Sequence, residues 1–372
     1  MTDELCRRAF LKNSAALAGS ALIGGDVIHA HAANAAPIEV PVVDRLIVRV
    51  LLDSSHDIFL GAQQVNGVEI QRARGASDFR RSLHNQWGLS LLLESQRAAE
   101  PRTLLLDFGY TPEALINNME ILGVDPRRID ALIVSHGHYD HFGGLIGFLQ
   151  KYRAILPAEL KLYAGGEENF CHRLNRAPAQ GQFTDFGVLD RRQLTGLRVT
   201  TVLADRPTVI SGHAFTTGPI QRTGFEKVLP NTMVEYGTKD GLGCDASHFT
   251  SAELNGKIVP DEHLHEHATC FNVKDRGLVV ITSCGHVGII NTIRQAQQVS
   301  GVRKLHALIG GFHLGPAPLP YIAQSVAELK TLEPDVVVPM HCSGVNFVQA
   351  MREQMPDKLL ISSTGSRISF GG

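Results

Sequence analysis

The sequence predicts an α/β fold with its functional site along one edge of a sheet. Strand-length apolar runs come first, and from about residue 100 they alternate with segments of helical length. Four of the predicted strands end in a loop that carries histidine, and these strands end at Val134, Thr282, Ile309 and Pro339. Because ligands of open α/β sheets bind beyond the carboxyl ends of the strands, the four loops are expected to converge on one crevice.

Composition fits one large globular domain and excludes several classes of protein. Hydrophobic residues make up 44% of the 372 residues and charged residues 19%, unlike a collagenous, coiled-coil or disordered chain. The net charge of −2, with no basic stripe, argues against a nucleic-acid partner. No run approaches the ~18 apolar residues of a membrane span, so none is expected. The oligomeric state stays open.

Residues 1–36 have the layout of an export signal. Paired arginines followed by Phe-Leu-Lys, within Cys6–Lys12, resemble a bacterial twin-arginine signal. The apolar run Ala15–Ile28 and the alanine-rich stretch after it complete the basic, apolar and A-x-A regions. Glycines within the run argue against the alternative, a buried amphipathic helix. We therefore predict a signal segment over 1–36, one mature domain over 37–372, and a periplasmic or secreted protein.

In the first half of the mature chain, apolar runs predict strands and capping residues place the helices. The predicted strands are Arg45–Leu52, Leu89–Glu94, Thr103–Asp107, Ile129–Val134, Leu160–Tyr163 and Val199–Leu203. Thr111 is a typical N-cap, Pro112 fits the first helical position, and Gly123 ends the helix. A second helix is expected from about Phe142 to Tyr152.

In the second half, strands and helices alternate regularly. The predicted strands are Thr269–Val273, Leu278–Thr282, Leu305–Ile309 and Val336–Pro339. Helices are expected over about Gly288–Val299, Tyr321–Leu332 and Phe347–Gln354. Residues 164–198 and 218–266 are rich in Gly, Asn, Asp and Pro, so we predict loops or a small insert over the site.

The cysteines do not indicate a disulfide framework. Five remain after residue 36, and their odd number and irregular spacing leave only a single bridge open. Cys284 and Cys342 each lie close to a candidate ligand. Since cysteine is more often a small buried residue than a ligand, we interpret both as core residues.

The strongest chemical signal is the cluster formed by His136, His138, Asp140 and His141. Imidazole and carboxylate together suit zinc and similar divalent metals. His136 and His138 share one face of an extended loop, since residues i and i+2 do so. Asp140 and His141 then fall on the first turn of the next helix, where they can face a second metal ion.

The motif H-x-H-x-D-H followed by Phe-Gly-Gly resembles the signature of the metallo-β-lactamase fold superfamily. Leu105–Gly109 resembles that superfamily's first motif, a strand ending in aspartate. Three later segments resemble the branch described as dihydropteroate-synthase-like or methanopterin-biosynthesis-related metallo-hydrolases. These segments are Thr282–Asn291, Gly310–Leu314 and Pro339–Gly344.

The resemblance implies an αββα sandwich with loop inserts over the metal site. It assigns His136, His138 and a later histidine to a first metal ion, and Asp140, His141 and His341 to a second. The later histidine is predicted to be His286, with His313, His265 and His267 as alternatives. The superfamily's bridging aspartate has no equivalent acid here, which leaves one or two ions open. Zn²⁺ is the expected metal, with Mn²⁺ or Fe²⁺ as alternatives.

The implied function is hydrolysis of an ester, phosphoester, lactone or related bond in a small, anionic substrate. A metal lowers the pKa of bound water to around 7 and so supplies hydroxide. Asp140 would orient this nucleophile, Asp107 would fix a ligand histidine, and Tyr139 and His313 would donate a proton or bind the oxyanion. Amides at the helix start near Gly288 could hold an anionic group.

The same residues allow two alternatives to the hydrolase. A metal-binding or ligand-binding protein without turnover would keep the same ligands. A diiron redox site on the same fold is disfavoured, because such members replace the histidine at position 138 by glutamate. The sequence does not identify the substrate.

Overall fold

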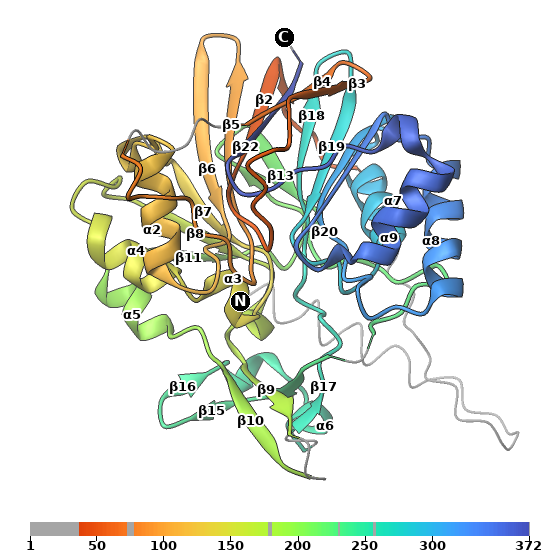
Figure 1. Ribbon diagram of the computed structural model, residues 1–372. Coiled ribbons are helices and arrows are strands. Elements are labelled where there is room, and N and C mark those ends of the chain that lie inside the picture. Colours follow the sequence, from red (N-terminus) through yellow and green to blue (C-terminus); the bar gives the residue numbers. More distant parts are fainter. Residues whose placement is uncertain (1–36, 73–77, 178–180, 230, 256–257, 372) are drawn as a thin grey trace, which may run out of the picture. The chain divides into compact units, whose positions relative to one another are not determined.

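Two mixed β-sheets lie face to face with helices on both outer sides, which confirms the predicted αββα sandwich (Figure 1). The computed structural model describes residues 37–371 except 73–77, 178–180, 230 and 256–257. The predicted signal segment over residues 1–36 lies outside the described residues.

The first sheet has nine strands and carries the histidine-rich loop. In spatial order these are β11 (Thr200–Leu203), β8 (Lys161–Ala164), β7 (Ala131–Val134), β6 (Glu100–Leu106), β5 (Ser90–Arg97), β2 (Arg45–Leu52), β22 (Ser366–Phe370), β4 (Val68–Arg72) and β3 (Gln63–Val65). The run from β11 to β6 is parallel, whereas the remaining pairs are antiparallel. β7 is buried along its whole length and delivers the loop at its carboxyl end.

The second sheet contributes three parallel strand ends. Its strands in order are β12 (Val209–Ile210), β13 (Ala214–Thr216), β18 (Thr269–Val273), β19 (Gly277–Thr282), β20 (Leu305–Gly311) and β21 (Val336–Met340), with β1 (Val42–Val43) beside β18. Because β19, β20 and β21 are parallel neighbours, their carboxyl ends lie next to one another at one edge.

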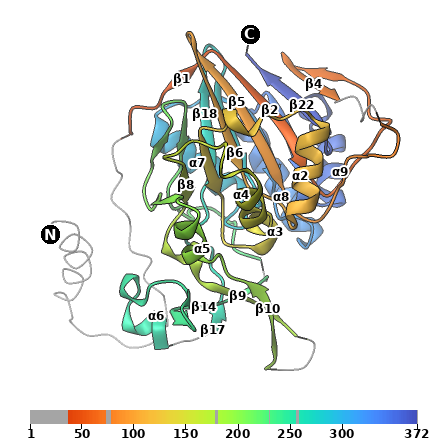
Figure 2. The ribbon, with the colours of Figure 1, turned by 90° about the vertical axis from the view of Figure 1, so that its left-hand side faces the viewer.

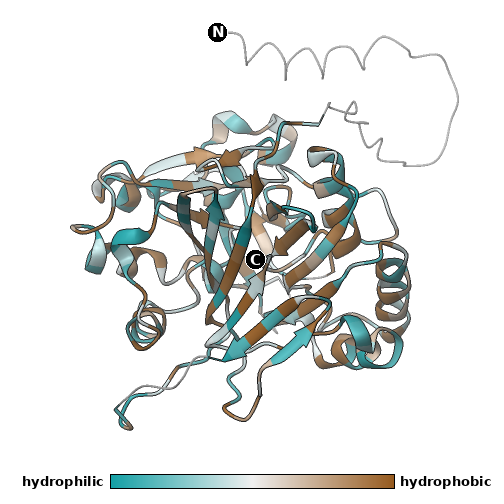
Figure 3. Ribbon diagram, turned by 90° about the horizontal axis from the view of Figure 1, so that it is seen from above, coloured by the Kyte–Doolittle hydropathy of each residue, from teal (hydrophilic) through white to brown (hydrophobic). Residues whose placement is uncertain are grey.

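Three hydrophobic layers hold the sandwich together. The central layer lies between the sheets, and an outer layer separates each sheet from its helices. The first sheet is covered by α2 (Pro112–Ile121), α4 (Leu145–Tyr152) and α5 (Arg191–Gly196), and the second by α7 (Ile289–Ser300), α8 (Leu319–Thr331) and α9 (Val345–Gln354). Figure 3 shows long hydrophobic stretches in the strands. Each sheet is covered on one face by the other sheet and on the opposite face by helices, so its central strands are apolar on both faces.

The predicted helix starting at Pro112 has the expected cap. The Thr111 side chain accepts a hydrogen bond from the Ala114 amide, and Pro112 occupies the first position. The helix predicted from Phe142 is divided into α3 (Tyr139–Phe142) and α4. Within the described residues no helix is long and apolar enough to cross a bilayer.

A separate small sheet, the insert sheet, lies beside the site. It consists of β10 (Phe183–Gly187), β9 (His172–Arg176), β14 (Met233–Glu235) and β17 (Ile258–Pro260), and Figure 2 shows it below the main sheets. The hairpin β15 (Thr238–Lys239) with β16 (Leu242–Gly243) and the helix α6 (Ser251–Asn255) accompany it. The segments predicted as loops or an insert therefore form a sheet of their own. Short 3₁₀ turns occur at Pro126–Arg128, Glu167–Phe170, Ala246–His248, His341–Ser343 and Pro356–Lys358.

Candidate metal centre

The loop after β7 folds back sharply and gathers three imidazole rings. The ring of His136 lies 4.7 Å from that of His138 and 4.3 Å from that of His141, measured between centroids. α3 begins at Tyr139, so Asp140 and His141 fall within its single turn. The short helix thus turns the last two ligand-type residues back toward the first two.

The second sheet adds one histidine from each of three strand ends. His286 follows β19, His313 follows β20 and His341 follows β21. The His286 ring is 4.8 Å from that of His138, and the His341 ring is 5.0 Å from that of His141. Two groups of donors result, each with its ligand atoms within 4.8 Å of one another. They are His136 with His138 and His286, and Asp140 with His141 and His341.

Unpartnered donor atoms show that these groups fit a divalent metal. The Nε2 atoms of His136, His141, His286 and His341 and Oδ1 of Asp140 are buried without a hydrogen-bond partner among the described residues. Buried polar atoms are normally paired, so a cluster of unpaired ones requires another explanation. Imidazole nitrogen and carboxylate oxygen are suitable Zn²⁺ ligands.

Hydrogen bonds from residues outside the donor groups hold the His138 and His141 rings in place. Asp107 Oδ2 lies 2.7 Å from His141 Nδ1 and accepts a hydrogen bond from Ser135 Oγ. His138 Nε2 lies 2.8 Å from Thr232 Oγ1, which leaves Nδ1 as the ligand atom of His138. Such contacts orient metal ligands and fix their tautomers. Asp107 thus stands where the sequence placed it, while its role in activity stays a prediction.

Burial and neighbouring charges together set the charge states of His136, His138, His286 and Asp140. It lowers the pKa of His136, His138 and His286 well below the usual value, and neighbouring histidines lower it further. Burial raises the pKa of Asp140, but His141 and His341 outweigh this effect and leave it below the ordinary value. Neutral imidazoles and an ionised carboxylate are the forms that bind metal.

Three more histidines, close together in sequence, have separate environments. His265 Nε2 accepts a hydrogen bond from the Gly137 amide at 2.9 Å, and His267 Nε2 donates to the Val134 carbonyl at 3.1 Å. His263 stacks on His286 with a centroid distance of 3.9 Å. The geometry therefore favours His286 over His265 and His267 beside His136 and His138. Nothing in the sequence distinguishes these environments.

Sequence reasoning missed Cys284. Its Sγ lies within 4.8 Å of the ligand atoms of His136 and His141, which belong to different donor groups. A sulfur donor thus stands between the two groups, where no acid was found in the sequence. The available signal was its position two residues after the end of β19 and two residues before His286.

A cavity of about 460 Å³ opens onto the donor groups. Asn175, Arg176 and Phe186 of the insert sheet line it together with Trp87 and His313. Tyr139 is absent from this lining among the described residues. Its ring instead contacts those of Tyr110 and Phe142, at 5.0 and 5.4 Å. His313 is therefore in position to meet a substrate, whereas Tyr139 is packed among aromatic rings, and both catalytic roles stay predictions.

The amides near the start of α7 are already paired. The Asn291 amide donates to Glu226 Oε2 at 2.9 Å, and the amides of His286 and Val287 donate to Glu266. The interpretation of these amides as a site for a substrate anion is therefore wrong, because the chain's own carboxylates occupy them. Burial raises the pKa of Glu226 to about 7.

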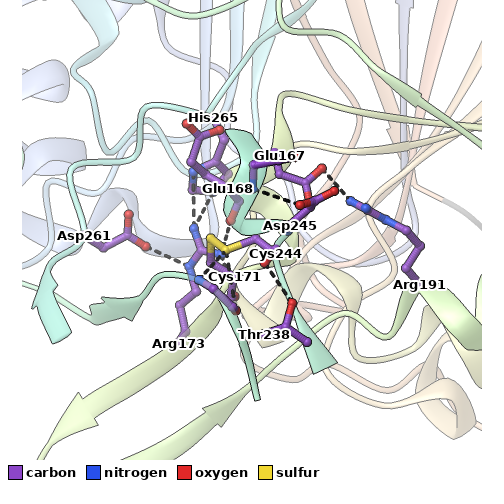
Figure 4. The surroundings of a disulfide bond; sticks show 12 residues. Glu167, Glu168, Cys171, Arg173, Arg191, Thr238, Cys244, Asp245, Asp261 and His265 are labelled. Carbon is purple, nitrogen blue, oxygen red and sulfur yellow. Dashed lines mark hydrogen bonds and ion pairs between the residues drawn. A yellow bond between two sulfur atoms is a disulfide. The ribbon is translucent and has the colours of Figure 1, made fainter. Parts of the chain in front are cut away.

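A disulfide fixes the base of the insert sheet (Figure 4). It joins Cys171, just before β9, to Cys244, just after β16, and is the single bridge that the sequence left open. The fully buried Arg173 donates to the Cys171 carbonyl, forms a 2.9 Å ion pair with Asp261 and contacts His265. Through His265 and its bond from Gly137, the bridge region is connected to the metal-binding loop.

The sequence pattern of the metallo-beta-lactamase superfamily matches residues 90–341. The chain belongs to this superfamily. The crystal structure of Tm1679 is similar in fold to this chain. It is described as a metal-dependent hydrolase of the beta-lactamase superfamily, with TM-score 0.63, 22% identity, and coverage of 87% of this chain and 98% of that one.

Two proteins of Methanocaldococcus jannaschii are similar in sequence to this metallo-β-lactamase-fold chain. One is 7,8-dihydropterin-6-methyl-4-(beta-D-ribofuranosyl)-aminobenzene-5'-phosphate synthase, 26% identical, with coverage of 77% of this chain and 90% of the relative. The other is uncharacterized, 25% identical, with coverage of 70% and 84%. The first relative is named for a dihydropterin compound, while membership of the methanopterin-related branch stays a prediction for this chain.

Proposed function

We propose that this chain is an exported, metal-dependent hydrolase of a small, anionic substrate. The observation that carries the proposal is the pair of unpartnered donor groups at a cavity wide enough for a small molecule. Imidazole and carboxylate donors that open onto such a cavity are typical of hydrolytic metal sites. The bond cleaved is an ester, phosphoester, lactone or related bond.

The two donor groups would each hold one metal ion, and two cavity residues would act on the water and the substrate. His136, His138 and His286 would hold one ion, and Asp140, His141 and His341 a second. A divalent ion bound there supplies an activated water at neutral pH and polarises the substrate oxygen. Asp140 lines the cavity, and its ionised carboxylate orients the attacking water. His313 faces the same cavity and is placed to donate to the oxygen on which charge develops.

The cavity wall favours a substrate with a planar ring and an anionic group. Trp87 and Phe186 offer aromatic faces, and the exposed Arg176 offers a guanidinium that pairs well with phosphate or carboxylate. The name of the methanogen relative contains both a dihydropterin and a phosphate. This agreement supports the choice of substrate class.

Export rests on two observations of different kinds. The twin-arginine-like segment within residues 1–36 is the first. The second is the Cys171–Cys244 disulfide, since such bonds persist in oxidising compartments such as the periplasm. The proposal is therefore a periplasmic or secreted enzyme.

Turnover by metal-loaded protein tests the proposal against a binding protein without activity. The panel contains phosphodiesters, phosphomonoesters, lactones and thioesters, and elemental analysis gives the metal content. We expect turnover that disappears with the metal in His138→Ala and persists in His84→Ala, a variant of an exposed histidine. Tight binding of one panel compound without hydrolysis of any would establish the binding protein instead.

A further inference from the structure

Two thiols and an imidazole meet beside the His/Asp groups. Cys284 Sγ lies 3.2 Å from Cys342 Sγ and 3.6 Å from His313 Nδ1. The three ligand atoms lie within 4.8 Å of one another and line the cavity. Each comes from a different strand end of the second sheet, after β19, β20 and β21. Neither Cys342 nor the sulfur pair has a part in the proposed hydrolysis.

The backbone around the thiols is shaped to accommodate them. A side chain at Gly311 would place its Cβ 2.3 Å from the Ser283 carbonyl oxygen and 2.9 Å from Cys342 Sγ, so glycine is needed for the close approach of both. The His313 amide donates a hydrogen bond to the same sulfur at 3.2 Å. His313 itself has φ +46°, a left-handed conformation that is uncommon for a non-glycine residue and concentrates at functional sites.

We infer that Cys284, His313 and Cys342 form a separate site for a soft, thiophilic cation such as Cu⁺ or Zn²⁺. Thiolate sulfur selects such ions, whereas the imidazole and carboxylate donors of the other groups suit harder divalent ions. On binding, each thiol releases its proton to solvent and forms a bond to the cation, so no electron is transferred. Three ligands leave one position of a tetrahedral ion facing the cavity.

The two sulfur atoms need to move apart only slightly to bind a cation. Two sulfurs at the ~2.3 Å Zn–S distance of a tetrahedral site stand about 3.8 Å apart, so the pair must separate by roughly half an ångström. Cys284 and Cys342 are both buried, with 3% and 4% of their surface exposed. Both also line the cavity, through which a cation can reach them. Cys284 also lies near His136 and His141, so an ion on the thiols stands next to the hydrolytic centre. Because this ion would bind His313 Nδ1, it would also compete with the proton-donor role proposed for His313.

Cadmium is a suitable probe, because a thiolate–Cd²⁺ bond has a charge-transfer absorption in the ultraviolet that imidazole and carboxylate ligands lack. The full chain with its Cys171–Cys244 bridge intact is loaded with Zn²⁺ and titrated with Cd²⁺, and in a second arm with Cu⁺. We expect about one tightly bound equivalent that absorbs as a thiolate complex. Alkylation of Cys284 and Cys342, followed by mass spectrometry, should fall at least about tenfold on loading.

Variants separate this site from the hydrolytic one. Cys342→Ser should lose the tightly bound equivalent of Cd²⁺ and at least about half of the thiolate absorption. Cys270→Ser, at a buried free cysteine in β18, should keep both. His138→Ala should lose turnover yet keep the thiolate absorption, so failure of one proposal does not imply failure of the other.

Three results would overturn the inference. One is the absence of thiolate absorption from the wild-type chain. Another is full absorption in Cys342→Ser. The third is a Cys284–Cys342 disulfide, found by mass spectrometry in protein kept under reducing conditions mild enough to spare Cys171–Cys244, together with no Cd²⁺ uptake. The alkylation measurement needs no variant and therefore decides the case even if Cys342→Ser does not fold.

Discussion

The two sheets contribute to the metal centre in different ways. The first sheet provides Ser135–His141 as one contiguous loop, so four candidate ligands are placed by local backbone geometry. The second sheet provides Cys284, His286, His313 and His341 from three strand ends that meet only because β19, β20 and β21 are parallel neighbours. A contiguous motif keeps its shape locally, whereas dispersed ligands depend on the register of a whole sheet.

The histidine-rich loop of the first sheet and the strand ends of the second sheet are also held by different kinds of contact. The loop is held by buried polar contacts from Asp107, Arg173 and His265. The strand ends are held by backbone amides that donate to the carboxylates of Glu226 and Glu266. Damage to each side should therefore give a different measurable result.

The largest effect is expected from removing a ligand of the loop. Structural zinc sites bind with about 10–16 kcal/mol over four ligands, so His136→Ala should weaken metal binding by roughly 10²- to 10³-fold and abolish turnover. His341→Ala, on the strand-end side, should lose only the ion held with Asp140 and His141. Elemental analysis of both variants checks this. Loss of all metal in His341→Ala would show that the two sides are not separable.

Arg173 is the next most sensitive position. Arg173→Met leaves Asp261 buried without its partner, which should lower the free energy of unfolding by about 3–5 kcal/mol. Arg192→Met removes an exposed ion pair to Asp190 and should cost less than about 1 kcal/mol. Urea unfolding of both variants measures the difference. Equal effects would mean that the buried pair does not support the loop.

Glu226 should make stability depend on pH on the strand-end side. Burial raises its pKa from 4.5 to about 7, so the folded state holds the proton more tightly than the unfolded state does. The resulting stabilisation is present below pH 4.5 and is lost as the pH rises through 7, and it amounts to about 3 kcal/mol at most. Glu226→Gln should reduce the pH dependence measured by urea unfolding between pH 5 and 8, and the rest persists because burial also raises the pKa of Glu266 to about 7.

The control for Glu226→Gln is Glu159→Gln, at an exposed glutamate. It should keep the pH dependence of the wild-type chain. An unchanged slope in Glu226→Gln would show instead that the amides at the start of α7 stabilise the ionised carboxylate as much as burial disfavours it.

The smallest effect is expected from Asp107→Asn. Asn tolerates the φ of +57° found at Asp107 but cannot accept the His141 and Ser135 hydrogen bonds with a full negative charge. Metal affinity should fall about 10–100-fold with the fold retained. Competition with a chelator measures it, and Asp125→Asn at a solvent-exposed cap is the control. Unaltered affinity would indicate that the loop needs no support from Asp107.

The sequence predicts this fold well wherever a run is long and apolar. β2 has the predicted bounds, and the alternating second half gives β18 to β21 with their helices. β22 was missed because Ser366–Phe370 alternates polar and apolar residues and pairs with β2 from the far end of the chain. The insert sheet is not predicted as a sheet because its strands are only three to five residues long and pair across long separations, as β9 does with β14.

The same distinction limits what the sequence says about the site. The contiguous ligands of the loop were found because their spacing alone indicates metal chemistry. His286 could not be separated from His265 and His267, since only the tertiary contacts of Gly137 and Val134 show that the latter two face the backbone. The sequence indicates only a core residue at Cys284. Its sulfur lies close to His136 because the two sheets pack against each other, which the sequence does not reveal.

The disulfide has a consequence for how the protein responds to a protease. Cys171 and Cys244 are 73 positions apart, and Arg176 and Phe186 of the cavity wall lie between them. A single cut between the two cysteines would leave both fragments covalently joined. Nicked protein would therefore migrate as one species on a non-reducing gel and separate into two only after a reductant is added. The part of the cavity wall between the two cysteines would stay attached to the protein after such a cut.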